Sequence, residues 1–165
     1  MANTGSLDGY KVVAAIKTDT TKLGDNGYTI FTNETECSIQ TTVAMTEYLF
    51  KRNKGNTSNK PGAKSATLSI ELAHDVEDPA FEYCADHQGE AIEYQILVLD
   101  EAASNAPSNA NKPDIYTVKI EANGYLSDLN EGFASGIATE SMTIVPGGKF
   151  KRNAGVGRAR VLSAT

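Results

Sequence analysis

The sequence predicts a mainly β fold with one flanking α-helix, and three observations support that fold class. Several short segments alternate apolar and polar residues, which is the pattern of a strand with one buried face. The chain has 14 glycines and no tryptophan, a composition that favours many turns. Only the stretch after Asp78 combines a helix start, an apolar stripe and a stop signal. With 165 residues, the chain is expected to form a single domain spanning residues 1–165.

The stretch from residue 66 to residue 99 is the centre of the predicted fold. Every second residue from Ala66 to Leu72 is apolar, so a strand is expected there. A helix is expected next, and a second strand follows over residues 91–99. A helix of about ten residues has little stability alone, so it must pack against a sheet.

The predicted helix has recognisable ends and one apolar face. Asp78 stands directly before Pro79, and an N-cap acceptor followed by proline at the first helical position favours a helix start. Gly89 is typical of a helix end. Phe81 and Cys84 lie three residues apart, on one side of the helix, where they are expected to contact the sheet.

Further strands are expected on both sides of this centre. After residue 123, Asn123-Gly124 predicts a turn or a bulge, and Pro146-Gly147-Gly148 predicts the end of the last strand. The side chains of Tyr116, Val118 and Ile120 are expected on one face of their strand. The remaining expected strands span residues 11–17, 28–32, 36–44 with a continuation over 47–51, 115–122, 125–129 and 137–145.

Polar segments are expected to form loops and arms. Residues 1–10 are small and polar and read as an N-terminal arm, and residues 100–111 read as an exposed loop. Residues 51–64 are expected to form a long basic loop that carries Lys51, Arg52, Lys54, Lys60 and Lys64. Residues 149–165 are expected to form a C-terminal arm that carries Lys149, Lys151, Arg152, Arg158 and Arg160.

The distribution of charge predicts self-association. The net charge is −6, yet residues 65–111 hold ten acidic residues and no lysine or arginine. Residues 51–64 and residues 141–165 each hold five basic residues and no acidic one. A single charge run is usually a solvated face. Two basic extensions and one acidic body instead favour contacts between different patches of neighbouring copies, which generate rings or filaments.

Nucleic-acid binding is the competing interpretation of the basic segments. Residues 51–64 contain no aromatic residue for stacking on bases, and Phe50 is the only one beside them. The acidic body would also repel phosphate groups. The sequence therefore favours self-association over binding of nucleic acid.

No pattern of catalytic or metal-binding residues is recognisable. The chain lacks a nucleophile elbow, a paired-histidine zinc helix and a phosphate-binding loop, so we expect no enzyme activity and no cofactor. Cys37 stands far from Cys84, and the pair with His74 and His87 lacks the close ligand spacing of structural zinc. Two reduced thiols are expected, with a disulfide as the alternative. We recognise neither a secretion signal nor a membrane span.

In layout the chain resembles the major tail tube proteins of bacteriophages with long non-contractile tails. The resemblance covers most of the chain: an N-terminal arm, an early strand, a long polar loop after Ile39-Gln40-Thr41-Thr42, and then the strand, helix and strand of residues 66–99. The run from Tyr116 to Leu129 and the run from Met142 to Gly148 resemble the closing strand pair of that family.

This resemblance implies two packed antiparallel sheets with a flanking helix, in a sandwich-like or barrel-like arrangement. It also implies a structural virion protein whose six-membered rings stack into a tail tube. DNA would pass through the lumen without specific binding. The partners implied are other copies of the chain, a tape measure protein and tail terminator proteins. Residues 51–64 would reach an adjacent ring, and both termini would serve as arms between rings.

The residues are also compatible with a different class of function. A solitary β-sandwich that binds a sugar or a peptide through its loops would share the same strand-rich composition. The two readings differ in one observable property, because only the tail tube reading predicts rings or tubes. An enzyme whose site is assembled from scattered residues is the third reading.

Overall fold

The computed structural model describes residues 12–24, 26–49, 57–74, 78–105, 114–133, 138–152 and 159–161. Most of these residues lie in strands, and the predicted mainly β class with one flanking helix is confirmed. No helix in these ranges is long and apolar enough to cross a membrane. The elements are β1 (Val12–Lys17), β2 (Tyr28–Ile30), β3 (Glu34–Leu49), β4 (Thr57–His74), α1 (Pro79–Asp86), β5 (Ala91–Leu99), α2 (Glu101–Ser104), β6 (Ile115–Gly132), β7 (Ala138–Arg152) and β8 (Ala159–Val161).

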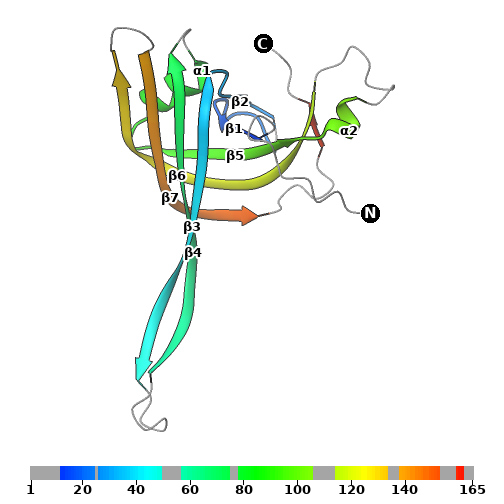
Figure 1. Cartoon of the computed structure of the whole chain (residues 1–165). Helices are drawn as coiled ribbons and strands as arrows, with labels where there is room; N and C mark the ends of the chain where they lie inside the picture. The colour runs from blue at the N-terminus through cyan, green and yellow to red at the C-terminus, as the bar shows by residue number, and fades with distance from the viewer. Residues whose placement is uncertain are drawn as a thin grey trace.

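The strands form one antiparallel sheet in the order β2-β1-β5-β6-β7-β4-β3, and β8 pairs with β6 beside this path. The two implied layers are therefore halves of one continuous sheet. They are joined because β6 pairs with β5 over residues 116–125 and with β7 over residues 120–132. Figure 1 shows the strands of the two halves crossing one another. The sheet is not closed, since β2 and β3 at its two ends do not pair.

The main core lies between the two halves and under α1. The apolar side chains of Ala80, Phe81 and Cys84 on α1 are fully buried, whereas Glu82 and Asp86 on its other side are exposed. This is the one-faced helix that the sequence predicts. The largest buried partners from the strands are Ile16, Leu68, Ile70, Leu72, Ile92, Tyr94, Ile120, Met142 and Ile144.

The prediction of a loop over residues 57–64 is wrong, because these residues form the first part of β4. They pair with β3 in an antiparallel register that runs from Val43 opposite Lys64 to Leu49 opposite Thr57. Every side chain of this stretch is exposed, so neither face carries the apolar alternation by which a strand is recognised in sequence. The paired residues 43–49 and 57–64 extend from the body as a two-stranded ribbon, called the arm below (Figure 1).

The predicted end of the last strand at Pro146-Gly147-Gly148 is also wrong. Strand β7 continues through these residues to Arg152, so the first residues of the predicted C-terminal arm are strand. The β4–β7 ladder ends at Ile144, and beyond it β7 pairs only with β6. One edge of β7 is therefore open at Pro146. Proline is tolerated there because no neighbouring strand on that edge needs a backbone N–H group from this residue.

The bulge predicted at Asn123-Gly124 is confirmed. The β6–β7 register shifts between Ala122 and Gly124, and Gly124 stands opposite Pro146. A Cβ atom at Gly124 would overlap the carbonyl oxygen of Val145 and the side chain of Ile144. This position requires glycine because the two backbones approach too closely for a side chain.

A second bulge separates side chains that are expected to share one face. Ile96 stands opposite Ile120 and Leu97 opposite Val118, so the bulge lies at the intervening residue of β6. Val118 therefore joins a small cluster with Leu97 on the outer face, while Ile120 joins the main core. Tyr116 packs against the cluster of Val118, as expected. The expectation that Ile120 shares this face is wrong, because alternation reverses at a bulge.

Some predicted segments lie outside the described residues. These are the N-terminal arm over residues 1–10 and three of the predicted loop cations, Lys51, Arg52 and Lys54. Arg158 also lies outside, whereas Arg160 belongs to β8, which pairs with the first residues of β6. Of the loop expected over residues 100–111, residues 101–104 form the short helix α2 instead.

Candidate assembly interface

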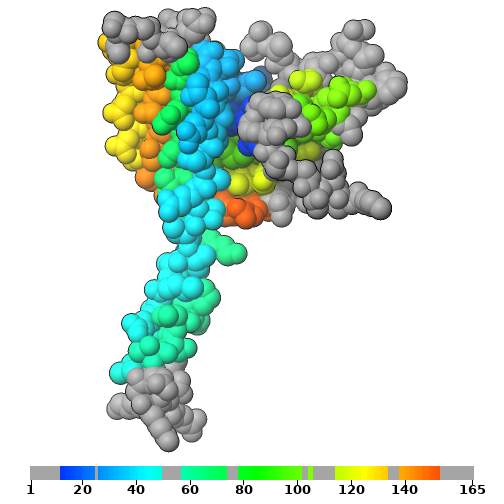
Figure 2. Space-filling view, in the orientation of Figure 1, coloured from blue at the N-terminus to red at the C-terminus, as the bar shows by residue number. Residues whose placement is uncertain are grey.

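The arm is the part of the described chain with the least internal support. All nine residues of β3 from Thr41 to Leu49 are exposed, as are all eight residues of β4 from Thr57 to Lys64. Figures 1 and 2 show the arm projecting well away from the body. An isolated two-stranded ribbon is marginally stable in water. The arm therefore has little packing support within the described part of the subunit.

Large apolar side chains on the arm face solvent. Val43 is 40% exposed, Met45 is 65% exposed, Tyr48 is 42% exposed and Leu49 is 69% exposed. Exposed apolar residues are ordinary when scattered, but a group on one short element marks a contact surface. These four lie within seven residues of one strand.

Strands β3, β4 and β6 each have an open edge. Strand β3 is the last strand in the sheet order, so its outer edge is open along its whole length. Strand β4 pairs with β7 only from Leu68 onward, and β6 has β7 as its sole strand partner from Leu126 to Gly132. An open edge presents N–H and C=O groups that can pair with a strand of another chain.

Two of the predicted loop cations can be placed in the structure. Lys60 and Lys64 lie on β4 within the arm, and both are exposed. Lys60 stands opposite Thr46 and Lys64 opposite Val43. The arm therefore carries both the two predicted contact lysines, on β4, and the exposed apolar side chains, on β3. Composition alone does not reveal that these residues lie together.

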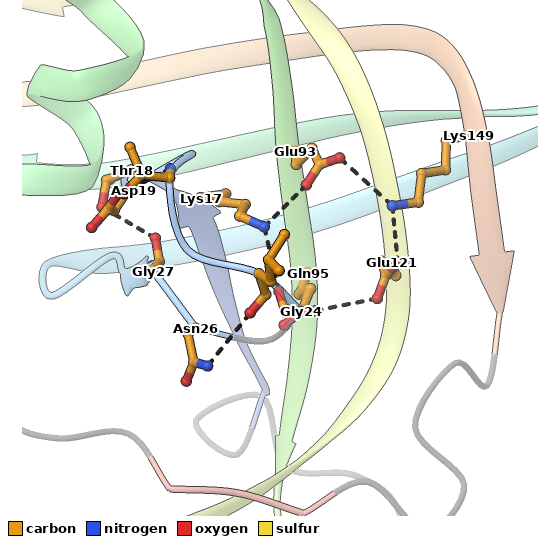
Figure 3. Close-up of polar contacts among 12 residues, drawn as sticks. Lys17, Thr18, Asp19, Gly24, Asn26, Gly27, Glu93, Gln95, Glu121 and Lys149 are labelled. Atoms are coloured by element: carbon orange, nitrogen blue, oxygen red, sulfur yellow. Dashed lines mark hydrogen bonds and ion pairs between the residues drawn. The ribbon is translucent and has the colours of Figure 1, made fainter.

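The predicted C-terminal arm residue Lys149 binds its own subunit instead (Figure 3). Its ammonium group lies 3.1 Å from a carboxylate oxygen of Glu121 and 3.6 Å from one of Glu93, and Lys17 lies 3.7 Å from the other oxygen of Glu93. The hydrogen bond to Glu121 raises the pKa of Lys149 above its ordinary value. These ion pairs join β1, β5, β6 and β7 across the outer face of one half-sheet.

The other described cations of that segment are placed differently. Lys151 and Arg152 are exposed at the end of β7, where they stand opposite Glu121 and Ile120 of β6. Position 160 pairs through its backbone with Tyr116. The predicted C-terminal residues therefore do not form one extended arm within the described chain.

The predicted helix residues have structural positions. Asp78 is the N-cap of α1 and Pro79 its first residue, and the side chains of Phe81 and Cys84 are buried in the core. Gly89 follows the helix with φ of +85°, a conformation that favours glycine. These residues position the helix and offer no group for chemistry at the surface.

The cysteines are not suited to nucleophilic chemistry. Both are free thiols, with Cys84 buried and Cys37 half-buried. Burial raises the pKa of each to about 12, so the reactive thiolate is scarce near neutral pH. Within the described ranges, no group of histidine, cysteine and carboxylate side chains is placed to hold a metal ion.

A cleft of about 640 Å³ lies between the start of β1 and the start of β3. Its lining includes Val12, Phe31, Glu34 and Cys37. The carboxylate of Glu34 accepts a hydrogen bond from the backbone N–H of Ala14 at 3.0 Å, and burial raises the pKa of this carboxyl. A ligand-binding function would use this cleft, but the Glu34 carboxylate within it links the start of β3 to β1.

Comparison with known proteins gives matches in structure alone. No protein-family model matches the chain, and no curated protein matches it. The SPP1 tail tube matches with a TM-score of 0.61 at 12% identity, over 89% of this chain and 80% of that chain. The virion of a native gene transfer agent matches with a TM-score of 0.59 at 10% identity, over 89% of this chain and 98% of that chain.

Two further structures extend this comparison. The tail of the empty gene transfer agent particle, determined with C6 symmetry, matches with a TM-score of 0.58 at 14% identity over 89% of this chain and 98% of that chain. The baseplate of the anti-feeding prophage, six-fold symmetrised, matches with a TM-score of 0.51 at 9% identity over 97% of each chain. The chain therefore has the fold found in these tail tube and baseplate structures.

Proposed function

We propose that this chain is a structural virion protein that assembles with copies of itself into the stacked rings of a phage-type tail tube. The observation that carries the proposal is the arm, whose fifteen residues from 43–49 and 57–64 are all exposed. A solitary binding module has no use for such an element, whereas a subunit of an assembly does. The tail tube and C6-symmetric tail structures that share the fold support the same conclusion and favour six copies per ring.

Two open edges of one half-sheet support the proposal that copies close into a ring. In the half formed by β6, β7, β4 and β3, the free edges are β3 and the last seven residues of β6. Pairing of β3 in one copy with β6 in the next is a heterologous contact, which closes into a ring when the rotation between copies permits it. Strand addition of this kind satisfies backbone groups that are otherwise open at the edge.

The outer face of this half-sheet fits the wall of a DNA conduit. Two rows cross it in register, from Glu36 through Glu71 and Ser141 to Asn130, and from Ser38 through Ser69 and Thr143 to Asp128. These rows contain no lysine or arginine. Because phosphate groups bind mainly to lysine and arginine, such a wall would let DNA pass without holding it.

The protein would belong to the tail of the virion and would have no enzymatic role. Lys51, Arg52, Lys54, Lys60 and Lys64 would face the adjacent ring, where their charge would speed association with an acidic surface. Tape measure and tail terminator proteins are the expected partners at the inside and the end of the tube.

Size-exclusion chromatography with light scattering separates this proposal from a solitary binding module. We expect the purified chain to elute as a concentration-dependent series of species that includes a six-copy ring. A single monomeric species at every concentration, with a sugar or peptide bound in the cleft near Glu34, would support the binding module instead.

A further inference from the structure

We infer that one face of β3 in the arm is an apolar docking stripe, formed by Val43, Met45 and Leu49, and that its occupant is a second copy of this chain. This inference rests on the proposed function and names the surface through which the arm makes its contact. The lysines of the arm then steer the approach of the two copies, whereas the stripe holds them together.

The stripe continues the core of the subunit into solvent. Side chains alternate along a strand, and Cys37 and Ile39 on β3 pack against the main core. The bulge beyond Val43 inserts its extra residue into β4, so β3 keeps its alternation and its odd-numbered side chains keep their face. The exposed fraction of the side chains along this face rises to 40% at Val43, 65% at Met45 and 69% at Leu49. The same face carries the exposed Glu47 between Met45 and Leu49, whereas Tyr48 lies on the other face. The face of β3 that packs against the core in the body is thus exposed to solvent in the arm.

The facing strand of the arm has the opposite character. From Thr57 to Lys64, β4 carries Lys60, Pro61, Gly62 and Lys64, and no large apolar side chain. Lysine, proline and bulges are the devices by which proteins prevent unwanted pairing at a sheet edge. The outer edge of β4 is therefore protected, whereas β3 from Thr41 to Leu49 has no lysine, proline or glycine and a single charged residue, Glu47. This asymmetry indicates that the arm docks through β3.

Charge at the other end of the same ribbon identifies the occupant. Glu36 on β3 stands directly opposite Glu71 on β4, both are exposed, and no ion pair to either is found within the described chain. Like charges directly opposite one another in a sheet are destabilising. A register shift at Thr35 places Glu36 there, since the preceding Glu34 pairs with the core residue Leu72 and Glu36 pairs with outward-facing Glu71.

The two described lysines of the arm are displaced along the ribbon from the pair formed by Glu36 and Glu71. Glu36 and Leu49 are thirteen residues apart on β3, which corresponds to about 43 Å of extended strand. Lys64 stands opposite Val43 and Lys60 opposite Thr46. These lysines can compensate Glu36 and Glu71 of another copy that is displaced along the ribbon axis. A head-to-tail contact of this kind uses two different surfaces of one chain, so a second copy satisfies both without any other protein.

The test compares substitutions on the two faces of β3 in the arm. The stripe variant carries Val43→Ser, Met45→Ser and Leu49→Ser, and the control carries Thr42→Ser, Ala44→Ser and Thr46→Ser on the opposite face. Analytical ultracentrifugation measures assembly, and thermal unfolding of the dilute monomer verifies the fold. Assembly would bury the side chains of the stripe. For each one that is replaced, we expect about a tenfold or greater rise in the concentration needed for assembly. The control should assemble as the wild type does.

Salt provides the second measurement. Raising ionic strength from 0.1 M to 1 M shortens the screening length from about 10 Å to about 3 Å, so it should slow assembly without dissolving finished assemblies. Finished assemblies that dissolve in salt, or a folded stripe variant that assembles normally, would overturn the docking stripe while leaving the proposed function intact. A single Leu49→Ser substitution serves if the triple variant does not fold. Failure of the wild-type chain to assemble at all would instead contradict the proposed function.

Discussion

The carboxylate of Asp78 accepts a hydrogen bond from the backbone N–H of Thr32 at 2.7 Å, which ties the start of α1 to the segment between β2 and β3. The same oxygen accepts from the backbone N–H of Asn33 at 3.3 Å. The other oxygen caps the helix by accepting from the N–H groups of Ala80 and Phe81, at 2.9 Å and 3.3 Å. Asp78 is only 2% exposed, so a single buried side chain fixes both the helix and the chain entering β3.

Asp78→Ala is therefore expected to cost more than the loss of a helix cap. Removal of an N-cap costs about 1 kcal/mol, and loss of hydrogen bonds to a charged group adds about 1.5–3 kcal/mol. Chemical denaturation should show a loss of about 3 kcal/mol in the free energy of unfolding. Glu82→Ala, an exposed carboxylate of the same helix, is the matched control and should change stability by about 0.5 kcal/mol or less. Equal effects for both would contradict the linking role of Asp78.

Glu34→Gln is expected to stabilise the protein at neutral pH. Burial first, and then the charge of Asp78, raise the pKa of Glu34 above its ordinary value of 4.5. The folded state therefore holds the Glu34 proton more tightly than the unfolded state, so stability is lost as the pH rises through the folded pKa. An amide oxygen at this position can still accept the hydrogen bond from Ala14.

The melting temperature of the Gln variant should exceed that of the wild type at pH 7. The difference should shrink as the pH falls through the raised pKa and should vanish below 4.5. Thermal unfolding scans from pH 4 to pH 8 test this dependence. A variant that is less stable than the wild type at pH 7 would show that the charge on Glu34 stabilises the fold.

Tyr94→Phe is expected to leave stability unchanged or to increase it. The ring of Tyr94 is fully buried in the core, and its hydroxyl has no hydrogen-bond partner within the described chain. Burial also raises the pKa of this phenol to about 12. An unsatisfied buried hydroxyl costs about 1–3 kcal/mol, so its removal without a change of shape relieves that cost. A lower melting temperature for Tyr94→Phe would reveal a partner for the hydroxyl.

Gly124→Ala is expected to destabilise the fold by about 1–3 kcal/mol, because the new Cβ would overlap the facing strand β7. Gly132→Ala is the control on the same strand, where the nearest atom is the hydroxyl oxygen of Thr139 at 3.0 Å, on a side chain that can rotate away. Urea denaturation of the two variants measures the difference. Similar stability for both would mean that β6 and β7 can separate at the bulge without cost.

The sequence is sufficient to predict the elements that bury one face. The strand over residues 66–72, the capped helix and the strand over residues 91–99 are all confirmed, because burial imposes a period that is visible in the residues. The turn or bulge expected at Asn123-Gly124 is confirmed as a bulge, since a glycine inside a strand often marks a bulge.

The predictions that are wrong concern segments in which the spacing of apolar residues carries no information about strand pairing. In the arm both faces are exposed, so residues 57–64 look like a loop although their backbone pairs with β3. Pro146 looks like a strand end, but it is tolerated because β7 has already passed its β4 partner. The ion pairs of Lys149 with Glu93 and Glu121 join residues far apart in the chain, so no local pattern indicates them.

Electron microscopy of the purified chain, over a range of concentrations, tests the central claim that this protein is a self-assembling tube subunit. An arm-truncated variant in which Asn-Gly replaces residues 43–64 provides the comparison. Thr42 and Ser65 then flank a two-residue turn, and they already face each other with their hydroxyl oxygens 2.8 Å apart. We predict six-fold rings stacked into tubes for the wild type and no tubes for the truncated variant. Only dispersed monomers of the folded wild-type chain at every concentration would contradict the account.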